Sequence, residues 1–175
     1  LMLISFLMVS CAEEHTHIIN LGYEEKEAKT IEFTNAQFIY SGDYAGEGSS
    51  DSWTIKFYTD MDIDEVGNPI GPGHIMQLAL NVKYADDQEA SLQNLVGDYL
   101  SQSHSGDFSA GTFVYGYLNL LDLPSGRVEI PDGTFYAAIA DGSTDMDVDI
   151  LDDGKLSVVL NDDGSVTVNG TLVGK

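Results

Sequence analysis

Cysteine and basic residues are both scarce in this sequence. Its 175 residues include one cysteine, Cys11. A single cysteine excludes an internal disulfide and a zinc cluster built on paired CxxC motifs. The chain carries 7 Lys and Arg against 29 Asp and Glu, so its formal net charge is −22. A field of that sign repels nucleic acid and anionic lipid headgroups and attracts cations, so we expect no nucleic-acid partner.

The sequence also lacks the short motifs that mark the common nucleophilic and phosphate-binding sites. There is no G-x-S-x-G, and the glycine-rich stretch at 41–48 is acidic and is followed by neither GK[ST] nor a predicted helix. With 29 acids some carboxylate pair is inevitable, so no particular pair points to glycoside hydrolysis. We therefore name no catalytic residue and lean against an enzyme.

No apolar run is long enough to cross a bilayer as a helix, which needs about 20 residues. The run LMLISFLMVSC at 1–11 is shorter and ends at the cysteine. It resembles a bacterial lipobox, in which a signal peptidase cuts before the cysteine and the thiol is diacylglycerylated. This predicts lipid attachment at Cys11, a membrane partner through that anchor, and a place in the cell envelope, periplasmic or on the outer surface. The alternative is a buried strand that ends in a core cysteine.

The rest of the chain is long enough for one domain. Hydrophobic residues make up 43% of the sequence, which argues against disorder, and a domain of this length buries roughly two-thirds of its unfolded surface. We predict a signal segment at 1–11, an acidic linker at 12–30 and a single β domain at 31–175. The acids that follow Cys11 resemble a surface-export signal of Bacteroidetes-type bacteria, or are a solvated linker.

Apolar and polar residues alternate most clearly near the C-terminus. The alternation on both sides of NDDG at 161–164 predicts a β-hairpin, since glycine tolerates the positive φ of a tight turn. We expect six side chains of this hairpin in the core: Leu156, Val158, Leu160, Val166, Val168 and Leu172.

Similar alternation recurs through the chain. It predicts strands at 37–40, 53–58 and 74–82, whereas 86–100 allows at most a short helix, with Leu92, Leu95, Val96 and Tyr99 at helical spacing. Turn residues separate about eight to ten strands. The fold prediction is an all-β antiparallel sandwich, with a partly open calycin-like β-barrel as the alternative.

Two copies of an acidic repeat are the main candidate for chemistry. TDMDID at 59–64 recurs as TDMDVD at 144–149, and a strand places alternate carboxylates about 7 Å apart on one face. Hard cations such as Ca²⁺ take several oxygen ligands. The first copy departs from a calcium loop because Glu65 replaces the glycine and no bidentate glutamate follows. The repeats either bind calcium weakly or form a polar strand face that contacts only solvent. The candidate ligands are Asp60, Asp62, Asp64, Asp145, Asp147 and Asp149.

The aromatic side chains offer a second candidate. They either pack the sheets or line a face that stacks on sugar rings. The candidate ligand face consists of Tyr40, Tyr44, Trp53 and Tyr58.

The turn motif IPDGTF at 130–135 and the closing pattern of DGKLSV, DGSVTV and GTL together resemble certain Bacteroidetes-type lipoproteins. The likeness extends loosely over 36–175. It implies a secreted β-rich domain with no assigned activity, and it supplies no catalytic residues.

These observations give three functional hypotheses. The first is a surface-anchored, non-catalytic binding or structural module whose partner is a glycan or another surface protein, with no cofactor required. The alternatives are a secreted glycan hydrolase and a lipocalin-like carrier of an apolar ligand.

Overall fold

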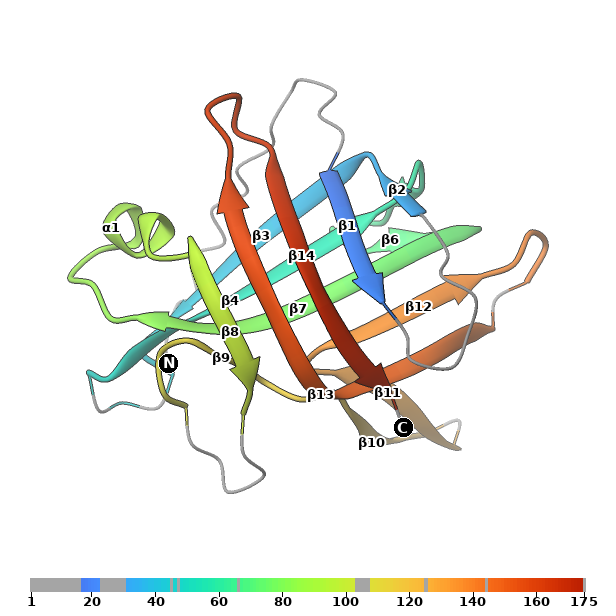
Figure 1. Cartoon of the computed structure of the whole chain (residues 1–175). Helices are drawn as coiled ribbons and strands as arrows, with labels where there is room; N and C mark the ends of the chain where they lie inside the picture. The colour runs from blue at the N-terminus through green and yellow to red at the C-terminus, as the bar shows by residue number, and fades with distance from the viewer. Residues whose placement is uncertain are drawn as a thin grey trace.

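The computed structural model describes residues 17–22, 31–44, 46, 48–65, 67–102, 108–124, 126–143 and 145–174. Within these ranges the chain forms strands almost throughout, with one short helix (Figure 1). The elements are β1 His17–Gly22, β2 Ile31–Phe33, β3 Asn35–Gly42, β4 Ser50–Tyr58, β5 Asp62–Ile63, β6 Pro69–Ile70, β7 Gly73–Lys83, α1 Gln88–Gln93, β8 Gly97–Ser101, β9 Thr112–Phe113, β10 Tyr117–Leu123, β11 Gly126–Asp132, β12 Phe135–Ile139, β13 Met146–Leu160 and β14 Val166–Gly174.

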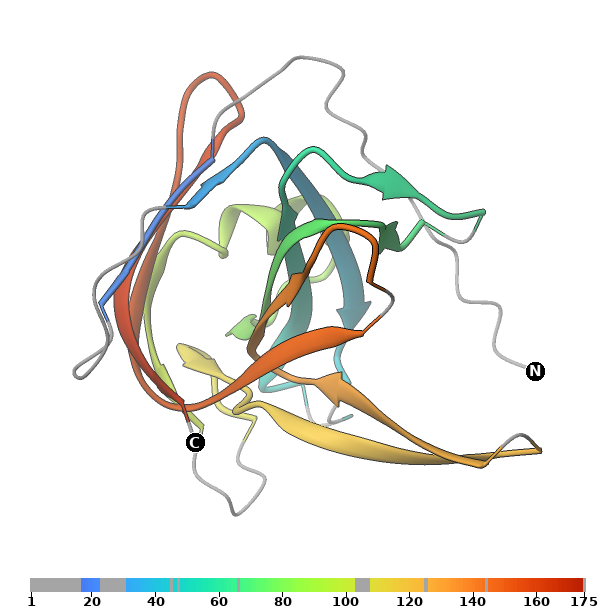
Figure 2. The same ribbon diagram turned by 90° about the vertical axis from the view of Figure 1, so that its right-hand side faces the viewer.

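One 10-stranded sheet contains most of these strands, in the order β2-β1-β14-β13-β8-β9-β7-β4-β3, with β12 paired to both β13 and β7. Because β13, β8, β9 and β7 are successive neighbours, β12 closes these five strands into a ring (Figures 1 and 2). The other sheet strands extend from this ring. Pairing is antiparallel except between β1 and β14 and between β8 and β9.

The prediction of an all-β fold is confirmed. The strand pairing closes a five-stranded barrel with extra strands and does not give a clear two-layer sandwich. Two small sheets stand apart from the large one in the described residues: β5 with β6, and β10 with β11.

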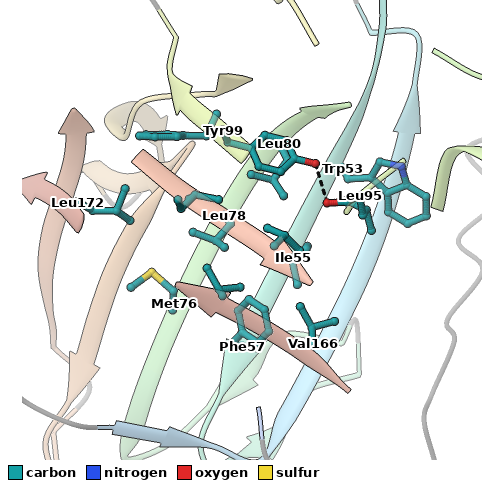
Figure 3. Packing of buried hydrophobic residues seen from close by; sticks show 14 of the residues in the cluster. Trp53, Ile55, Phe57, Met76, Leu78, Leu80, Leu95, Tyr99, Val166 and Leu172 are labelled. Atoms are coloured by element: carbon teal, nitrogen blue, oxygen red, sulfur yellow. Dashed lines mark hydrogen bonds between the residues drawn. The ribbon is translucent and has the colours of Figure 1, made fainter. Parts of the chain in front are cut away.

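The main core lies inside the curved large sheet, where side chains from β4, β7, β13 and β14 meet (Figure 3). Ile55, Phe57 and Leu78 have no exposed surface. Tyr99 on β8 is buried here as well, and its hydroxyl donates to the Leu95 carbonyl oxygen at 2.8 Å. Burial of an apolar side chain of this size stabilises the fold by roughly 1.5–3 kcal/mol, so these positions dominate stability.

A second, smaller cluster packs on the other face of β7, β12 and β13. Ile75, Phe135 and Ala137 are buried there, and partly buried side chains from neighbouring segments pack against them. Both faces of this part of the sheet are therefore covered by apolar side chains.

The C-terminal hairpin prediction is confirmed. β13 and β14 pair from Leu160 opposite Val166 onward, and Gly164 in the turn has φ 84°. Five of the six predicted core side chains are buried, and Leu160 is partly buried against the same cluster.

The segment at 86–100 is only partly helical. Asp87 caps α1 by accepting from the Ala90 N–H at 2.8 Å, and α1 ends at Gln93. Tyr99 lies on β8, and Val96 is 51% exposed. The prediction of at most a short helix is therefore confirmed, and the chain becomes a strand at Gly97.

β1 lies within the segment predicted as a linker at 12–30. Its residues pair with β14 from Ile18 opposite Thr167 to Gly22 opposite Thr171. The described part of the β domain thus begins at His17, before the predicted boundary at 31.

Candidate functional site

β10 and β11 form a two-stranded hairpin that extends away from the barrel, which we call the arm (Figure 2). Its strands pair in seven consecutive positions, from Tyr117 opposite Asp132 to Leu123 opposite Gly126. At its tip the Arg127 Nε donates to Asp122 Oδ1 at 2.9 Å, and both side chains are exposed.

The arm exposes large apolar side chains on both of its faces. Each of them is between 38% and 55% exposed. The register places Tyr117, Leu121, Val128 and Ile130 on one face, and Leu118 and Leu120 on the other. A contiguous apolar patch of this kind marks an interaction site more often than a scattered exposed leucine does.

Two glycines join the arm to the barrel. A Cβ at Gly116 would lie 2.2 Å from the Thr134 carbonyl oxygen, and a Cβ at Gly133 would lie 2.2 Å from the Tyr115 carbonyl oxygen. Gly133 also has φ 70°, in the left-handed region. The Gly116 N–H donates to the Leu151 carbonyl oxygen at 2.7 Å, which fixes the arm against β13.

Four aromatic side chains gather at the base of the arm, which we call the aromatic patch: Tyr44, Phe108, Tyr115 and Tyr117. The rings of Tyr44 and Phe108 lie 5.9 Å apart, and those of Tyr115 and Tyr117 lie 6.0 Å apart. The Tyr44 hydroxyl is close enough to Tyr117 to contribute to its raised pKa. Tyr44 is 72% exposed. The patch therefore presents aromatic surface to solvent.

A hydrogen-bonded carboxylate lies beside the aromatic patch. Asp132 Oδ2 accepts from the Tyr117 hydroxyl at 3.1 Å and from Asn119 Nδ2 at 2.9 Å. Its Oδ1 accepts from the Gly133 N–H at 2.7 Å. Burial raises the pKa of Tyr117, and the adjacent Asp132 carboxylate raises it further, so the phenol remains a donor at neutral pH.

Of the predicted ligand face, only Tyr44 belongs to the aromatic patch. Tyr40 and Trp53 pack together with ring centroids 4.9 Å apart, and Trp53 is 2% exposed with its Nε1 donating to Ser91 Oγ at 2.9 Å. Burial and the neighbouring Asp51 raise the pKa of Tyr40. Tyr58 packs against the second cluster. Tyr40 and Trp53 therefore contribute to the main core, and Tyr58 contributes to the second cluster.

The first acidic repeat forms a turn. Asp60 is exposed, and Asp62 lies in the two-residue strand β5. Asp64 Oδ1 accepts from the Asn68 N–H at 2.7 Å, and its Oδ2 accepts from Asn68 Nδ2 at 3.3 Å. The two copies therefore differ in local structure, since only the second is part of a long strand.

The second repeat lies at the start of β13, except for Asp145, which precedes it, and Thr144, which is outside the described residues. Val148 and Ile150 pack against the second cluster, whereas Met146 is 42% exposed. Asp147 and Asp149 point to the opposite face, which further along β13 carries Leu151 of the main core. The carboxylates and the apolar side chains occupy opposite faces, but the carboxylate face is the inner face, which also carries part of the main core.

A histidine and a tyrosine meet on this same inner face. The register puts Tyr136 opposite Asp149 and Ala138 opposite both His74 and Asp147. Burial raises the pKa of Tyr136, and Asp149 and Asp147 raise it further. Within the described ranges, no group of three or more His, Cys, Asp or Glu side chains is arranged to hold a metal ion. Calcium binding by the repeats stays a prediction.

The predicted lipid-attachment site, Cys11, lies outside the described residues. Among the residues that the structure does describe, no helix is long and apolar enough to cross a membrane.

No protein-family model, curated protein or solved structure matches this chain. The resemblance to Bacteroidetes-type lipoproteins therefore stays a prediction, and the argument for function depends on the chain's own surface.

Sequence reasoning missed Phe108, Asn119 and Asp132 as members of the candidate site. A signal was present, since YLNLL at 117–121 has too many apolar residues for a strand with one solvated face. The sequence alone did not show that this strand leaves the barrel.

Proposed function

We propose that this chain is a non-catalytic binding module of the bacterial cell envelope, held at the membrane by a lipid on Cys11, which binds a glycan through the aromatic patch. The observation that carries the proposal is the solvent-exposed aromatic surface of Tyr44 and Tyr117 beside the polar side chains of Asn119 and Asp132. Sugars present apolar ring faces and hydroxyl groups, and this combination of side chains suits both.

Charge narrows the class of glycan. A chain with a formal net charge of −22 repels polyanions, and the Asp132 carboxylate lies beside the aromatic patch. The ligand we propose is therefore a neutral polysaccharide.

The position of the patch suits a lipid-anchored module. β1 begins beside Thr167, near the start of β14, whereas the base of the arm contacts Leu151, which pairs with Gly174 at the other end. These two ends of β14 are separated by about 23 Å of strand. Cys11 precedes His17 by six residues, which span at most about 20 Å. This reach is slightly shorter than the strand distance to the base of the arm, which is compatible with a patch that stays clear of the membrane.

The two alternative functions gain no comparable support. A retaining or inverting hydrolase needs two carboxylates that flank the bond to be cleaved, and Asp132 already accepts three hydrogen bonds from its own chain. A lipocalin-like carrier belongs with the calycin-like barrel, but buried side chains fill the middle of this barrel (Figure 3).

Affinity electrophoresis in gels that contain neutral or acidic polysaccharides tests the proposal. We expect a neutral polysaccharide to retard the protein and Tyr44→Ala to abolish the retardation. The matched control is Tyr84→Ala, because Tyr84 is an exposed tyrosine outside the patch. If both variants are retarded like the wild type, the patch does not bind the glycan. Release of reducing sugar during incubation would instead favour the hydrolase.

A further inference from the structure

The arm has two outer edges, and they differ in chemistry. β10 and β11 pair with each other and with no other described strand. β11 carries Arg127, Glu129 and Pro131, and charges and proline are the usual means by which proteins protect a sheet edge from pairing. β10 has no proline in its seven residues, and its only charge is Asp122 near the tip.

A two-stranded hairpin with an unprotected edge lacks the further strand that would stabilise it. A two-stranded hairpin is at best marginally stable in water, and further strands or packing are needed to stabilise it. Here the apolar side chains are exposed on both faces of the arm. The β10 edge is therefore the position at which an additional strand would stabilise it.

We propose that β10 pairs antiparallel with β10 of a second copy of this chain, which joins the two arms into one four-stranded sheet. β10 begins at Tyr117 of the aromatic patch, but the pairing uses the backbone edge of the strand, so the proposal does not depend on glycan binding.

The sequence of β10 is self-complementary. Leu120 is its central residue, so a two-fold axis at Leu120 pairs all seven residues of one copy with those of the other. In that register Asn119 lies opposite Leu121, and Asp122 lies opposite Leu118. The two Asp122 carboxylates are kept apart by four residues, or roughly 14 Å.

Charge favours this edge as the contact between copies. Two molecules that each carry −22 repel one another wherever their acidic surfaces meet. The stretch from Tyr117 to Leu121 is uncharged, so two β10 edges can approach without a like-charge contact.

The area of contact sets the strength of the dimer. Two paired edges about 23 Å long bury roughly 500–700 Å² in total, less than the ~1,200 Å² of a stable complex. The dimer is therefore weak and reversible. Anchoring both copies in one membrane would raise their effective concentration.

Sedimentation equilibrium over a range of protein concentrations tests the proposal. The sample is the full chain with Cys11→Ser, because this change prevents lipidation of Cys11 and cross-linking through it. We expect a monomer–dimer equilibrium that shifts toward dimer at high salt. Between about 0.05 M and about 0.5 M NaCl, the screening length falls from more than about 10 Å to less than about 5 Å. A protein that stays monomeric at the highest concentration and salt overturns the proposal.

Two lysine variants locate the contact. Leu120→Lys places two positive charges opposite each other at the two-fold axis, and we expect it to weaken association at least tenfold. Val128→Lys introduces the same charge at an exposed side chain of β11 and should leave association unchanged. Both variants lower the net negative charge equally, so general repulsion cannot explain a difference. An equal loss in both variants contradicts pairing through β10.

Cross-linking and vesicle binding complete the test. In the Cys11→Ser chain, Leu120→Cys should form a disulfide-linked dimer on mild oxidation and Val128→Cys should not, because only position 120 meets itself across the axis. Circular dichroism verifies that each variant is folded. The vesicle test uses phosphatidylcholine vesicles. If the protein binds them and Leu120→Lys and Val128→Lys weaken this binding equally, the arm binds lipid and the dimer proposal is overturned.

Discussion

The imidazole of His74 and the phenol of Tyr136 lie against each other, with Nδ1 and the hydroxyl oxygen 2.7 Å apart and the ring centroids 5.9 Å apart. Both copies of the acidic repeat reach this pair. Thr59 of the first copy accepts from the His74 N–H through its Oγ1 at 3.0 Å. Asp147 and Asp149 of the second copy act on Tyr136 from β13. Two segments about 85 residues apart in sequence therefore meet at one end of the barrel.

The second cluster should couple the two repeats energetically. Met61 of the first copy and Val148 of the second pack against the same buried residues. In a double-mutant cycle by urea denaturation, Met61→Ala and Val148→Ala should show an interaction free energy of at least ~0.5 kcal/mol. The control pair is Met61→Ala with Val159→Ala, because Val159 is exposed on the C-terminal hairpin and its effect should be additive.

Calcium should bind weakly to the second repeat, with a Kd of ~10⁻⁴–10⁻³ M. At about ten times Kd, binding to the folded state alone adds ~1.4 kcal/mol to the free energy of unfolding, and Tm rises by about 3–5 °C. Differential scanning calorimetry measures this shift, and magnesium, which keeps its waters, should shift Tm less. The row from Asp145 to Asp149 is only a solvated face if Asp147→Asn leaves the calcium response intact.

Stability should fall at alkaline pH because buried tyrosines resist ionisation. Burial raises the pKa of Tyr99 far above its usual value of 10.0. The folded state therefore keeps the phenol proton at a pH at which the unfolded chain can release it. The contribution of Tyr99 to the free energy of unfolding is complete below about pH 10 and is lost as the pH rises above that value. Tyr99→Phe should flatten the decline of the unfolding free energy between about pH 10 and 12. At neutral pH it should cost ~1 kcal/mol, because the Leu95 carbonyl loses its donor. An unchanged alkaline slope would mean that other groups govern the decline.

Gly133 should be required for the junction between arm and barrel. Gly133→Ala forces a Cβ against the Tyr115 carbonyl oxygen at a left-handed φ, and we expect a loss of ~2–4 kcal/mol in the free energy of unfolding. Gly142→Ala is the control, since Gly142 has a similar φ of 73° but no atom within 4 Å of the added Cβ. Equal losses in the two variants would show that φ alone matters.

Cys11 should determine the membrane attachment of the chain. Cys11→Ala should move the protein from the membrane fraction to the soluble fraction, because several acyl chains are needed for stable anchoring and the variant has none. Metabolic labelling with a clickable palmitate should mark the wild type only. Label on the alanine variant would discard the lipobox.

Alternation in the sequence was sufficient to predict the strands that bury one clear face. Trp53, Ile55 and Phe57 on β4 and the hairpin of β13 and β14 follow it directly, since period 2 is a local property of a strand. The same local rule could not tell which face of β13 belongs to the main core. Asp149 and Leu151 share a face, and this becomes visible only when β12 pairs with β7 on one side and β13 on the other.

The candidate site was largely hidden from the sequence for a similar reason. Tyr44 and Tyr117 are far apart in the chain and meet because the arm leaves the barrel beside the loop that follows β3. Tyr40 and Trp53 have the composition of a ligand face, but Trp53 is buried in the main core and Tyr40 packs against it, partly buried. Contacts between distant segments, and not residue types, decided which aromatic side chains reached the surface.

The parallel pairing of β1 with β14 has a consequence for how the chain reaches its native state. Ile18 and Thr167 are paired neighbours although nearly the whole chain separates them, which gives this sheet a high contact order and a slow folding step. β1 cannot take its place until β14 has been synthesised and has paired with β13. A chain synthesised from its N-terminus would therefore remain without its completed sheet until β14 had emerged from the ribosome.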